Sequence, residues 1–198
     1  MDHAAPRTDP RIVRTRRLLR DAFVELLEEL DVEKISVNRL AERATINRVT
    51  FYLHYRDIPD MMEKMADDMI EDIRAILQSP ASRQLSVQES EWPLMVNLLQ
   101  HIAEHCRFYK VILATRRTPI FTERFLRLLT DMVVERIERP EGEAALAATG
   151  VQRDIAVWYG SSALIGTIIS WLRHDMPYTP VYMAKQFMLL RRHHEKKS

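Results

Sequence analysis

The sequence predicts an all-α protein, and three observations support this. Only four of the 198 residues are glycine, whereas sandwiches, barrels and phosphate-binding loops need glycine at their turns. Apolar residues recur along most of the chain at the three- and four-residue spacing of a helix face. The composition, 46% hydrophobic and 29% charged, suffices for a sizeable core. We therefore expect about nine helices, arranged as an N-terminal three-helix domain with a helix-turn-helix and a larger C-terminal helical bundle.

The first helix is predicted from about Pro10 to Leu30, after a flexible basic arm over residues 1–9. Leu19, Phe23 and Leu26 fall on one face of this helix. Its start is rich in arginine, and this basic segment predicts salt-sensitive attraction to DNA phosphates that is independent of base sequence. The arginines of this end are Arg7, Arg11, Arg14, Arg16, Arg17 and Arg20.

Two short helices follow on either side of a tight joint. Ser36 is expected to cap the first of them, because its hydroxyl can accept from amides that are unpaired in the first helical turn. That helix ends near Ala44, and Thr45 and Ile46 form the joint. Asn47 caps the next helix in the same way. Residues 10–56 are therefore predicted to form a helix-turn-helix that is supported by the first helix.

The third helix carries polar groups where a core helix would carry leucine. Phe51 and Tyr55 can face the core, which turns the start of the helix outward. A helix fits the major groove of DNA, where an arginine can bond guanine twice and a threonine methyl can touch thymine. The other polar groups suit phosphate oxygens, although a plain polar face on a helical bundle is the alternative. The candidate base-reading residues are Arg48, Val49 and Thr50, and the candidate phosphate-binding residues are Ser36, Asn47, Tyr52 and His54.

The stretch SVNRLAERATINRVTFYLHYRD resembles the DNA-binding signature of the tetracycline-repressor (TetR/AcrR) family. The resemblance covers about Val13 to Met69. It implies a DNA-binding transcriptional regulator, more often a repressor than an activator. The positions that match the family pattern in register are Ser36, Leu40, Ala41, Thr50, Phe51, Tyr52, His54 and Tyr55.

Two positions depart from the family pattern. The usual glycine of the turn is Thr45, and this predicts an altered turn because a β-branched residue disfavours positive φ. The usual lysine after the motif is Ile58, which removes an expected phosphate contact that Arg56 could replace.

Residues 57–198 are expected to form an effector-binding and dimerisation domain, with 57–77 as a linking helix. Asp57 would cap this helix, and Pro59 lies in its first turn, where proline costs no hydrogen bond. A polar loop begins at Gln78. The later helices are expected over 92–105, 108–115, 121–139, 154–174 and 180–193. The last three of them are separated by Pro119 and by the stretches RPEGE and MPYTP.

The helix over 154–174 is apolar on all sides, with small residues between the large ones. Burial against a second subunit would explain this pattern, and a core helix of a monomer is the alternative. The stretch GTIISWLRHDMPYTPVYMA also resembles the end of one TetR subgroup, and the family dimerises through its last two long helices. The resemblance implies a homodimer on a pseudo-palindromic operator of double-stranded DNA. The expected interface residues are Trp158, Ala163, Ile165, Ile169 and Phe187.

An effector of unknown identity, a small molecule or a protein partner, is expected to change operator affinity. It can do so only by preferring one separation of the recognition helices. Methionine and aromatic side chains suit an adaptable apolar pocket. The candidates are Met62, Met65, Met69, Trp92, Met95, Phe108, Tyr109, Phe121, Phe125 and Trp158.

Other functional classes have little support in the sequence. His101 and His105 have metal-ligand spacing, but no nearby second cluster completes a site, so no metal is expected. No glycine-rich phosphate loop or nucleophile elbow occurs, so we expect neither an enzyme nor a cofactor. The single cysteine and the absence of a long apolar run predict a cytoplasmic protein without a membrane segment. A helical scaffold, a partner-binding protein, or an activator controlled by a protein partner without a small-molecule ligand stays open as the alternative.

Overall fold

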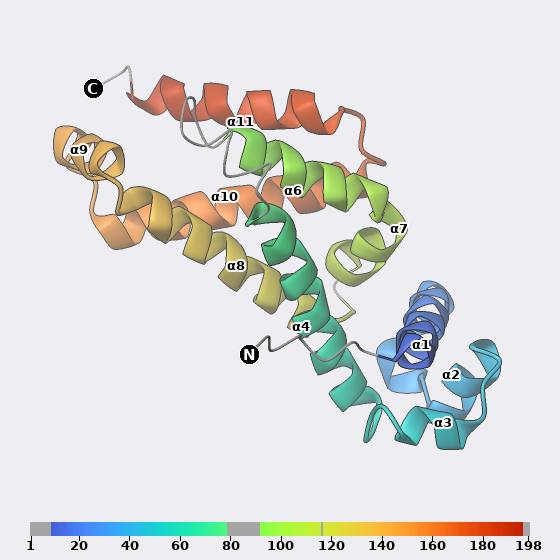
Figure 1. Cartoon of the computed structure of the whole chain (residues 1–198). Coiled ribbons are helices and arrows are strands. Elements are labelled where there is room, and N and C mark those ends of the chain that lie inside the picture. Colours follow the sequence, from blue (N-terminus) through green and yellow to red (C-terminus); the bar gives the residue numbers. More distant parts are fainter. Residues whose placement is uncertain (1–8, 79–91, 116, 196–198) are drawn as a thin grey trace, which may run out of the picture. The chain divides into compact units, whose positions relative to one another are not determined.

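The structure is a computed structural model that describes residues 9–78, 92–115 and 117–195, and every regular element in these ranges is a helix (Figure 1). The all-α prediction is therefore confirmed. The chain divides into two compact units, Met1–Met65 and Ala66–Ser198. Helix α4 (Ile58–Leu77), the expected linking helix, contributes residues to both. The predicted basic arm, apart from Asp9, and the predicted loop after Gln78 lie outside the described residues.

The core of the first unit lies between short helices. Leu19, Phe23 and Leu27 of α1 are fully buried, as are Leu40 of α2 and Phe51 of α3. Helix α2 packs against both α1 and α3. The elements of this unit before α4 are α1 (Pro10–Glu29), the 3-10 turn η1 (Val32–Lys34), α2 (Val37–Arg43) and α3 (Arg48–Tyr52).

Side-chain caps set the starts of these helices, and the three predicted caps are confirmed. The Ser36 hydroxyl accepts from the amide of Arg39 at 3.3 Å. The Asn47 Oδ1 atom accepts from the amide of Val49 at 2.8 Å. The Oδ1 atom of Asp57 accepts from the Asp60 amide at 2.8 Å. Because each cap satisfies an amide that the helix leaves unpaired, these side chains fix where α2, α3 and α4 begin.

The turn between α2 and α3 keeps the left-handed geometry that glycine favours, so the prediction of an altered turn at Thr45 is wrong. Thr45 has φ of 55°. Its amide donates to Glu42 O at 3.1 Å, and the amide of Ile46 donates to Ala41 O at 2.9 Å. These two bonds are the Schellman pattern that ends a helix. The paired carbonyls and the packing of α2 on α3 hold threonine in a strained conformation.

Replacing Thr45 with glycine is expected to stabilise the protein. A residue with a β-carbon in the left-handed region costs about 1–2 kcal/mol, and glycine removes this cost while losing some backbone entropy. We expect the free energy of unfolding to rise by ~1 kcal/mol in urea titrations followed by circular dichroism. Thr45→Ala, which keeps the β-carbon, is the control and should gain less. A Thr45→Gly protein no more stable than wild type would show that the turn is unstrained.

The second unit is a bundle of longer helices. Helix α10 packs along α8, and α11 packs along α6 (Figure 1). Phe121, Phe125 and Leu129 of α8 are fully buried within it, as is Ile168 of α10. The elements of this unit after α4 are α6 (Trp92–Glu104), α7 (Cys106–Tyr109), the π-helix η2 (Lys110–Ala114), α8 (Pro119–Ile137), α9 (Pro140–Thr149), α10 (Arg153–Arg173) and α11 (Pro180–Glu195).

The sequence prediction missed two features of this bundle. The segment RPEGE was interpreted as a break, but Pro140 occupies the first turn of α9, where its missing amide costs nothing. The described residues therefore hold ten α-helices, against about nine expected. The helix predicted over 108–115 is instead split between the end of α7 and the π-helix η2. The hydroxyl of the buried Thr118 donates to Ile112 O at 3.0 Å and so satisfies a carbonyl of this irregular segment.

Helix α10 has one buried face and one open apolar face. Val157, Ile165 and Ile168 are buried. Ile155, 51% exposed, and Trp158, 63% exposed, lie on the open side. The helix is long and apolar enough to cross a membrane by length and composition, yet only 33% of its apolar window is buried inside the chain. The described subunit therefore leaves much of this helix uncovered.

Candidate nucleic-acid interface

Helix α3 presents its N-terminal residues on the surface, as expected of a recognition helix. Arg48 is exposed and the Val49 side chain is 62% exposed, whereas Thr50 is half-buried. Phe51 and Tyr55 are buried beneath them and pack with ring centroids 5.6 Å apart. The buried aromatic pair therefore anchors a short helix whose outer face is free for a ligand.

The candidate phosphate-binding groups surround this helix. Ser36 and Asn47 are exposed at the starts of α2 and α3, although each also serves as a cap. Tyr52 is 54% exposed at the end of α3. His54 is half-buried, and burial lowers its pKa below the ordinary value, as do the charges of Arg16 and Lys64. The ring is therefore mainly neutral at pH 7 in the free protein.

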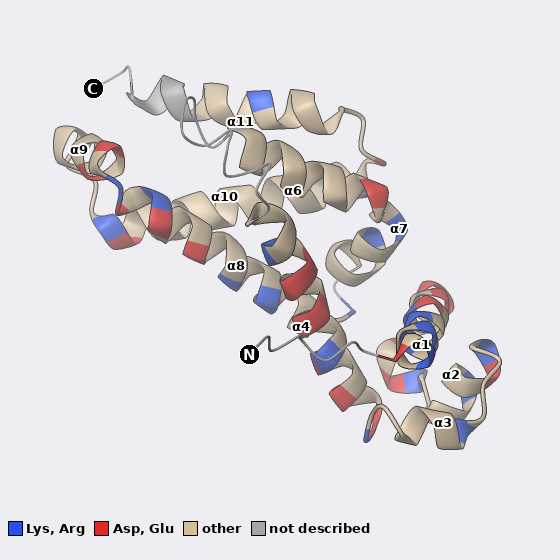
Figure 2. Ribbon diagram, in the orientation of Figure 1, with Lys and Arg blue, Asp and Glu red and all other residues tan. Residues whose placement is uncertain are grey.

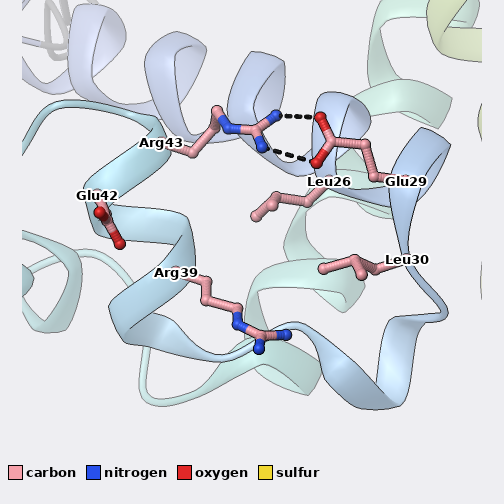
Figure 3. Close-up of a pocket in the computed structure, with 6 residues that line it drawn as sticks. All are labelled: Leu26, Glu29, Leu30, Arg39, Glu42 and Arg43. Carbon is pink, nitrogen blue, oxygen red and sulfur yellow. Dashed lines mark hydrogen bonds and ion pairs between the residues drawn. The ribbon is translucent and has the colours of Figure 1, made fainter.

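A bidentate ion pair fastens α2 to α1 (Figure 3). The guanidinium of Arg43 donates to both carboxylate oxygens of Glu29 at 2.8 Å. A second carboxylate, that of Glu25, lies 3.5 Å from the same guanidinium. The hydrogen bond from Arg43 lowers the pKa of Glu29. Because α2 in turn packs on α3, this pair helps to fix the recognition helix on its support.

Asp60 organises the joint between α3 and α4. Its side chain is 8% exposed, and it accepts from the Arg56 amide at 3.0 Å and from the Lys64 ammonium at 2.9 Å. The guanidinium of Arg56 also lies 3.1 Å from this carboxylate. Arg56 is therefore engaged within the chain, and Ile58, at the position of the usual lysine, is buried. The sequence interpretation overlooked Asp60 and Lys64, whose four-residue Asp-to-Lys spacing in a first helical turn was the available signal.

Asp60 is expected to make stability fall at low pH. The hydrogen bonds from the Arg56 amide and from Lys64 lower the pKa of Asp60 to about 2. The ordinary value in an unfolded chain is about 3.9, so this stabilisation is complete above pH ~4 and is lost as the pH falls through ~2. Urea titrations at pH 7, 4 and 2.5 should show wild type more stable than Asp60→Asn at pH 7, with the difference shrinking at pH 2.5.

Asp131→Asn serves as the control for this titration, because Asp131 is 61% exposed and its partner Arg74 is 3.8 Å away. It should show little pH-dependent difference from wild type. An Asp60→Asn difference that stays constant from pH 7 to pH 2.5 would contradict the role given to this carboxylate.

The residues expected to line an effector pocket differ in burial. Trp158 is largely exposed, which places it on the open face of α10 and corrects its assignment to an interior pocket. The ring centroids of Phe108 and Phe121 lie 6.2 Å apart, edge to face. The side chain of Trp92 lies outside the described residues. The pocket itself stays a prediction. Met65, Met69, Tyr109, Phe121 and Phe125 are buried, and Met62, Met95 and Phe108 are half-buried.

The residues expected in a dimer interface also differ in solvent exposure. Trp158 and Ala163 are exposed on α10, while Ile169 and Phe187 are half-buried. Ile165 is 8% exposed and belongs to the buried face of α10, so its place in the interface is corrected to the subunit core. Its position four residues from Ser161 and three from Ile168, which are both buried, explains this.

Charge is distributed unevenly over the elements (Figure 2). Arginine residues lie along the first part of α1 and acidic residues along its last part, whereas α10 carries no charged residue between Asp154 and Arg173. A metal site is a separate question. The ring centroids of His101 and His105 lie 4.6 Å apart, with the rings tilted by 41°, and among the described residues no group of three or more His, Cys, Asp or Glu is placed to hold a metal ion.

Comparison with known proteins agrees with this geometry. Residues 90–192 match a family model described as a transcriptional regulator C-terminal region of the TetR type. A curated relative, the uncharacterized HTH-type transcriptional regulator YxbF of Bacillus subtilis (strain 168), is 24% identical over 169 residues, or 85% of this chain. The chain spans only 42% of the length of that relative.

Solved structures share the fold. A TetR transcriptional regulator from Streptococcus agalactiae 2603V matches with a TM-score of 0.65 and 22% identity, covering 91% of this chain and 94% of that one. NalD, the secondary repressor of the MexAB-OprM multidrug efflux pump in Pseudomonas aeruginosa, matches with a TM-score of 0.63 and 21% identity, covering 90% and 93%.

An exposed recognition helix on a buried aromatic anchor, followed by a separate helical unit, defines a helix-turn-helix transcriptional regulator. The family model covers more than half of the chain. The chain belongs to the TetR family of transcriptional regulators.

Proposed function

We propose that the chain is a cytoplasmic, homodimeric, sequence-specific DNA-binding regulator that acts as a repressor. Residues 10–56 bind double-stranded DNA, and residues 57–198 bind an effector and the second subunit. The observation that carries this proposal is the outward-facing start of α3, where Arg48 and Val49 are exposed above the buried Phe51. This is the arrangement that a helix needs to reach base edges in the major groove.

Base reading is assigned to Arg48, Val49 and Thr50, and phosphate binding to the groups around them. An exposed guanidinium at the start of a helix can bond guanine O6 and N7 together. Polar side chains around such a helix can bind the phosphates of the DNA backbone. These contacts fix the register of the helix on the DNA without reading the base sequence. The phosphate-binding residues in this proposal are Ser36, Asn47, Tyr52 and His54.

The open apolar face of α10 and α11 supports a homodimer. Trp158 and Tyr159 are 63% and 64% exposed on α10, and Leu190 is 59% exposed on α11. Large exposed apolar side chains on two helices of one unit are typical of an interface. A second copy would cover it with the same residues, because a two-fold interface is self-complementary. Such a dimer presents two recognition helices, so the operator is pseudo-palindromic with half-sites about one helical turn apart.

The effector domain supplies the regulation in this proposal. A ligand of the second unit, a small molecule or a protein, changes operator affinity by favouring one arrangement of the dimer. We propose no membrane association, because α10 is apolar on the face that a second subunit would cover. We also propose no catalytic activity, since residues 90–192 match the C-terminal region of a family of transcriptional regulators.

The test is selection of bound duplexes from a random double-stranded library by the purified full-length protein, followed by fluorescence anisotropy. We expect a pseudo-palindromic consensus that is bound about 10³-fold or more tightly than scrambled DNA at physiological salt. Enrichment of no consensus, with affinity that vanishes as salt rises, would refute sequence-specific regulation and favour the scaffold alternative.

A further inference from the structure

Three basic residues from different elements of the first unit interact with one another beside the recognition helix. Arg16 lies on α1, His54 follows α3, and Lys64 lies on α4. The ammonium of Lys64 donates to His54 O at 3.2 Å, and the charge of Arg16 acts on the His54 ring. We call these three residues the basic triad.

Each member of the basic triad keeps hydrogen-bonding capacity for a ligand. Within the part of the chain that the structure describes, Arg16 has no acidic partner and the ring nitrogens of His54 have no hydrogen bond. Lys64 has three N–H donors and uses two of them, on Asp60 Oδ2 and His54 O. Lys64 is hydrogen-bonded to His54, and free donors of basic side chains at such a place fit an oxyanion.

We propose that the basic triad holds one backbone phosphate of the operator in each half-site, and that His54 takes up a proton when the phosphate arrives. This inference rests on the proposed function. It adds Arg16 and Lys64 to the DNA-binding residues and makes the affinity depend on pH. The phosphate supplies the negative charge that the triad lacks, since the nearby carboxylate of Asp60 is already bonded to Lys64 and Arg56.

The direction of the pH dependence follows from the surroundings of His54. In the free protein, burial and then the charges of Arg16 and Lys64 lower the pKa of His54. The ring centroid of Tyr55 lies 6.2 Å from that of His54. A bound phosphate favours the imidazolium and raises the pKa. Operator affinity therefore rises as the pH falls from 8 to 6, by at most about tenfold per half-site for each pH unit.

The experiment uses the full-length protein and the duplex obtained by selection. The ¹H–¹³C signal of the His54 ring is titrated with and without this duplex, and it is assigned by its loss in His54→Gln. Anisotropy then measures affinity at pH 6, 7 and 8 and at several salt concentrations. We expect the His54 titration to move to higher pH on binding, and His54→Gln to weaken operator binding and to remove its pH dependence.

Arg16→Met and Arg17→Met are a matched pair on α1. Arg17 pairs with Asp21 and its side chain is 79% exposed. Arg16→Met should reduce the salt dependence of binding by about one phosphate contact per half-site and raise the pH at which free His54 titrates, whereas Arg17→Met should do neither. Lys64→Gln should resemble Arg16→Met.

The outcomes separate this inference from the proposed function. Specific binding with an unmoved His54 titration, and with Arg16→Met behaving like Arg17→Met, would overturn the basic triad and leave the regulator intact. Failure of the wild-type protein to bind any selected duplex specifically would overturn the regulator, and the triad with it.

Discussion

Replacing Arg48 with alanine is expected to relax base preference at one position of each half-site. Arg48 is exposed at the first residue of α3, where a guanidinium can bond the two acceptors of a guanine in the major groove. The loss should amount to about 1–3 kcal/mol per half-site for the preferred base and to much less for the other bases at that position. Anisotropy against duplexes that differ at single positions measures this directly.

Tyr52→Phe is the matched control for Arg48→Ala. Tyr52 is 54% exposed at the end of the same helix, and the variant removes only its hydroxyl. A lost phosphate contact should weaken binding to all duplexes alike. If both variants lowered the affinity equally for every sequence, the division into base-reading and phosphate-binding residues would be wrong.

Replacing Trp158 with glutamate is expected to dissociate the dimer. The exposed Trp158 side chain lies on the uncharged stretch of α10, so a carboxylate there would be buried twice in a two-fold interface without a partner. Large aromatic anchors of this kind contribute about 2–4 kcal/mol, so we expect the dissociation constant to rise by about 30-fold or more. Analytical ultracentrifugation over a concentration series measures the change, and operator binding should weaken in parallel.

Gln100→Glu controls for the added charge. Gln100 is exposed on α6, outside the open face of α10 and α11, and the substitution conserves shape. This variant should remain a dimer. A Trp158→Glu protein that stays dimeric at nanomolar concentration would place the interface elsewhere.

The sequence predicted the first unit better than the second because its signals there are local. Three helix starts are predicted from side chains that accept a hydrogen bond from a nearby amide, and the structure confirms the caps at Ser36, Asn47 and Asp57. The turn at Thr45 was mispredicted because local propensity disfavours threonine at positive φ. The Schellman bonds and the packing of α2 on α3 override this preference, and neither is visible in the identity of one residue.

The errors in the second unit have tertiary causes. Gly142 was interpreted with Pro140 as a break, but a β-carbon at Gly142 would lie 2.5 Å from Arg136 O. Glycine is therefore needed where the start of α9 approaches the end of α8, and only the folded chain shows this approach. Ile165 was assigned to the dimer because α10 is apolar all round, and periodicity alone could not tell its inner face from its outer one.

The uncovered apolar side of α10 has a genetic consequence. If subunits must pair to cover it, chains made from two alleles in one cell will mix. An allele that replaces Arg48 leaves this surface intact. Its product would therefore pair with normal subunits, and each mixed dimer would hold a single functional recognition helix. Such an allele should be dominant over the normal copy, whereas an allele that alters Trp158 should be recessive, because its product cannot enter the mixed dimers.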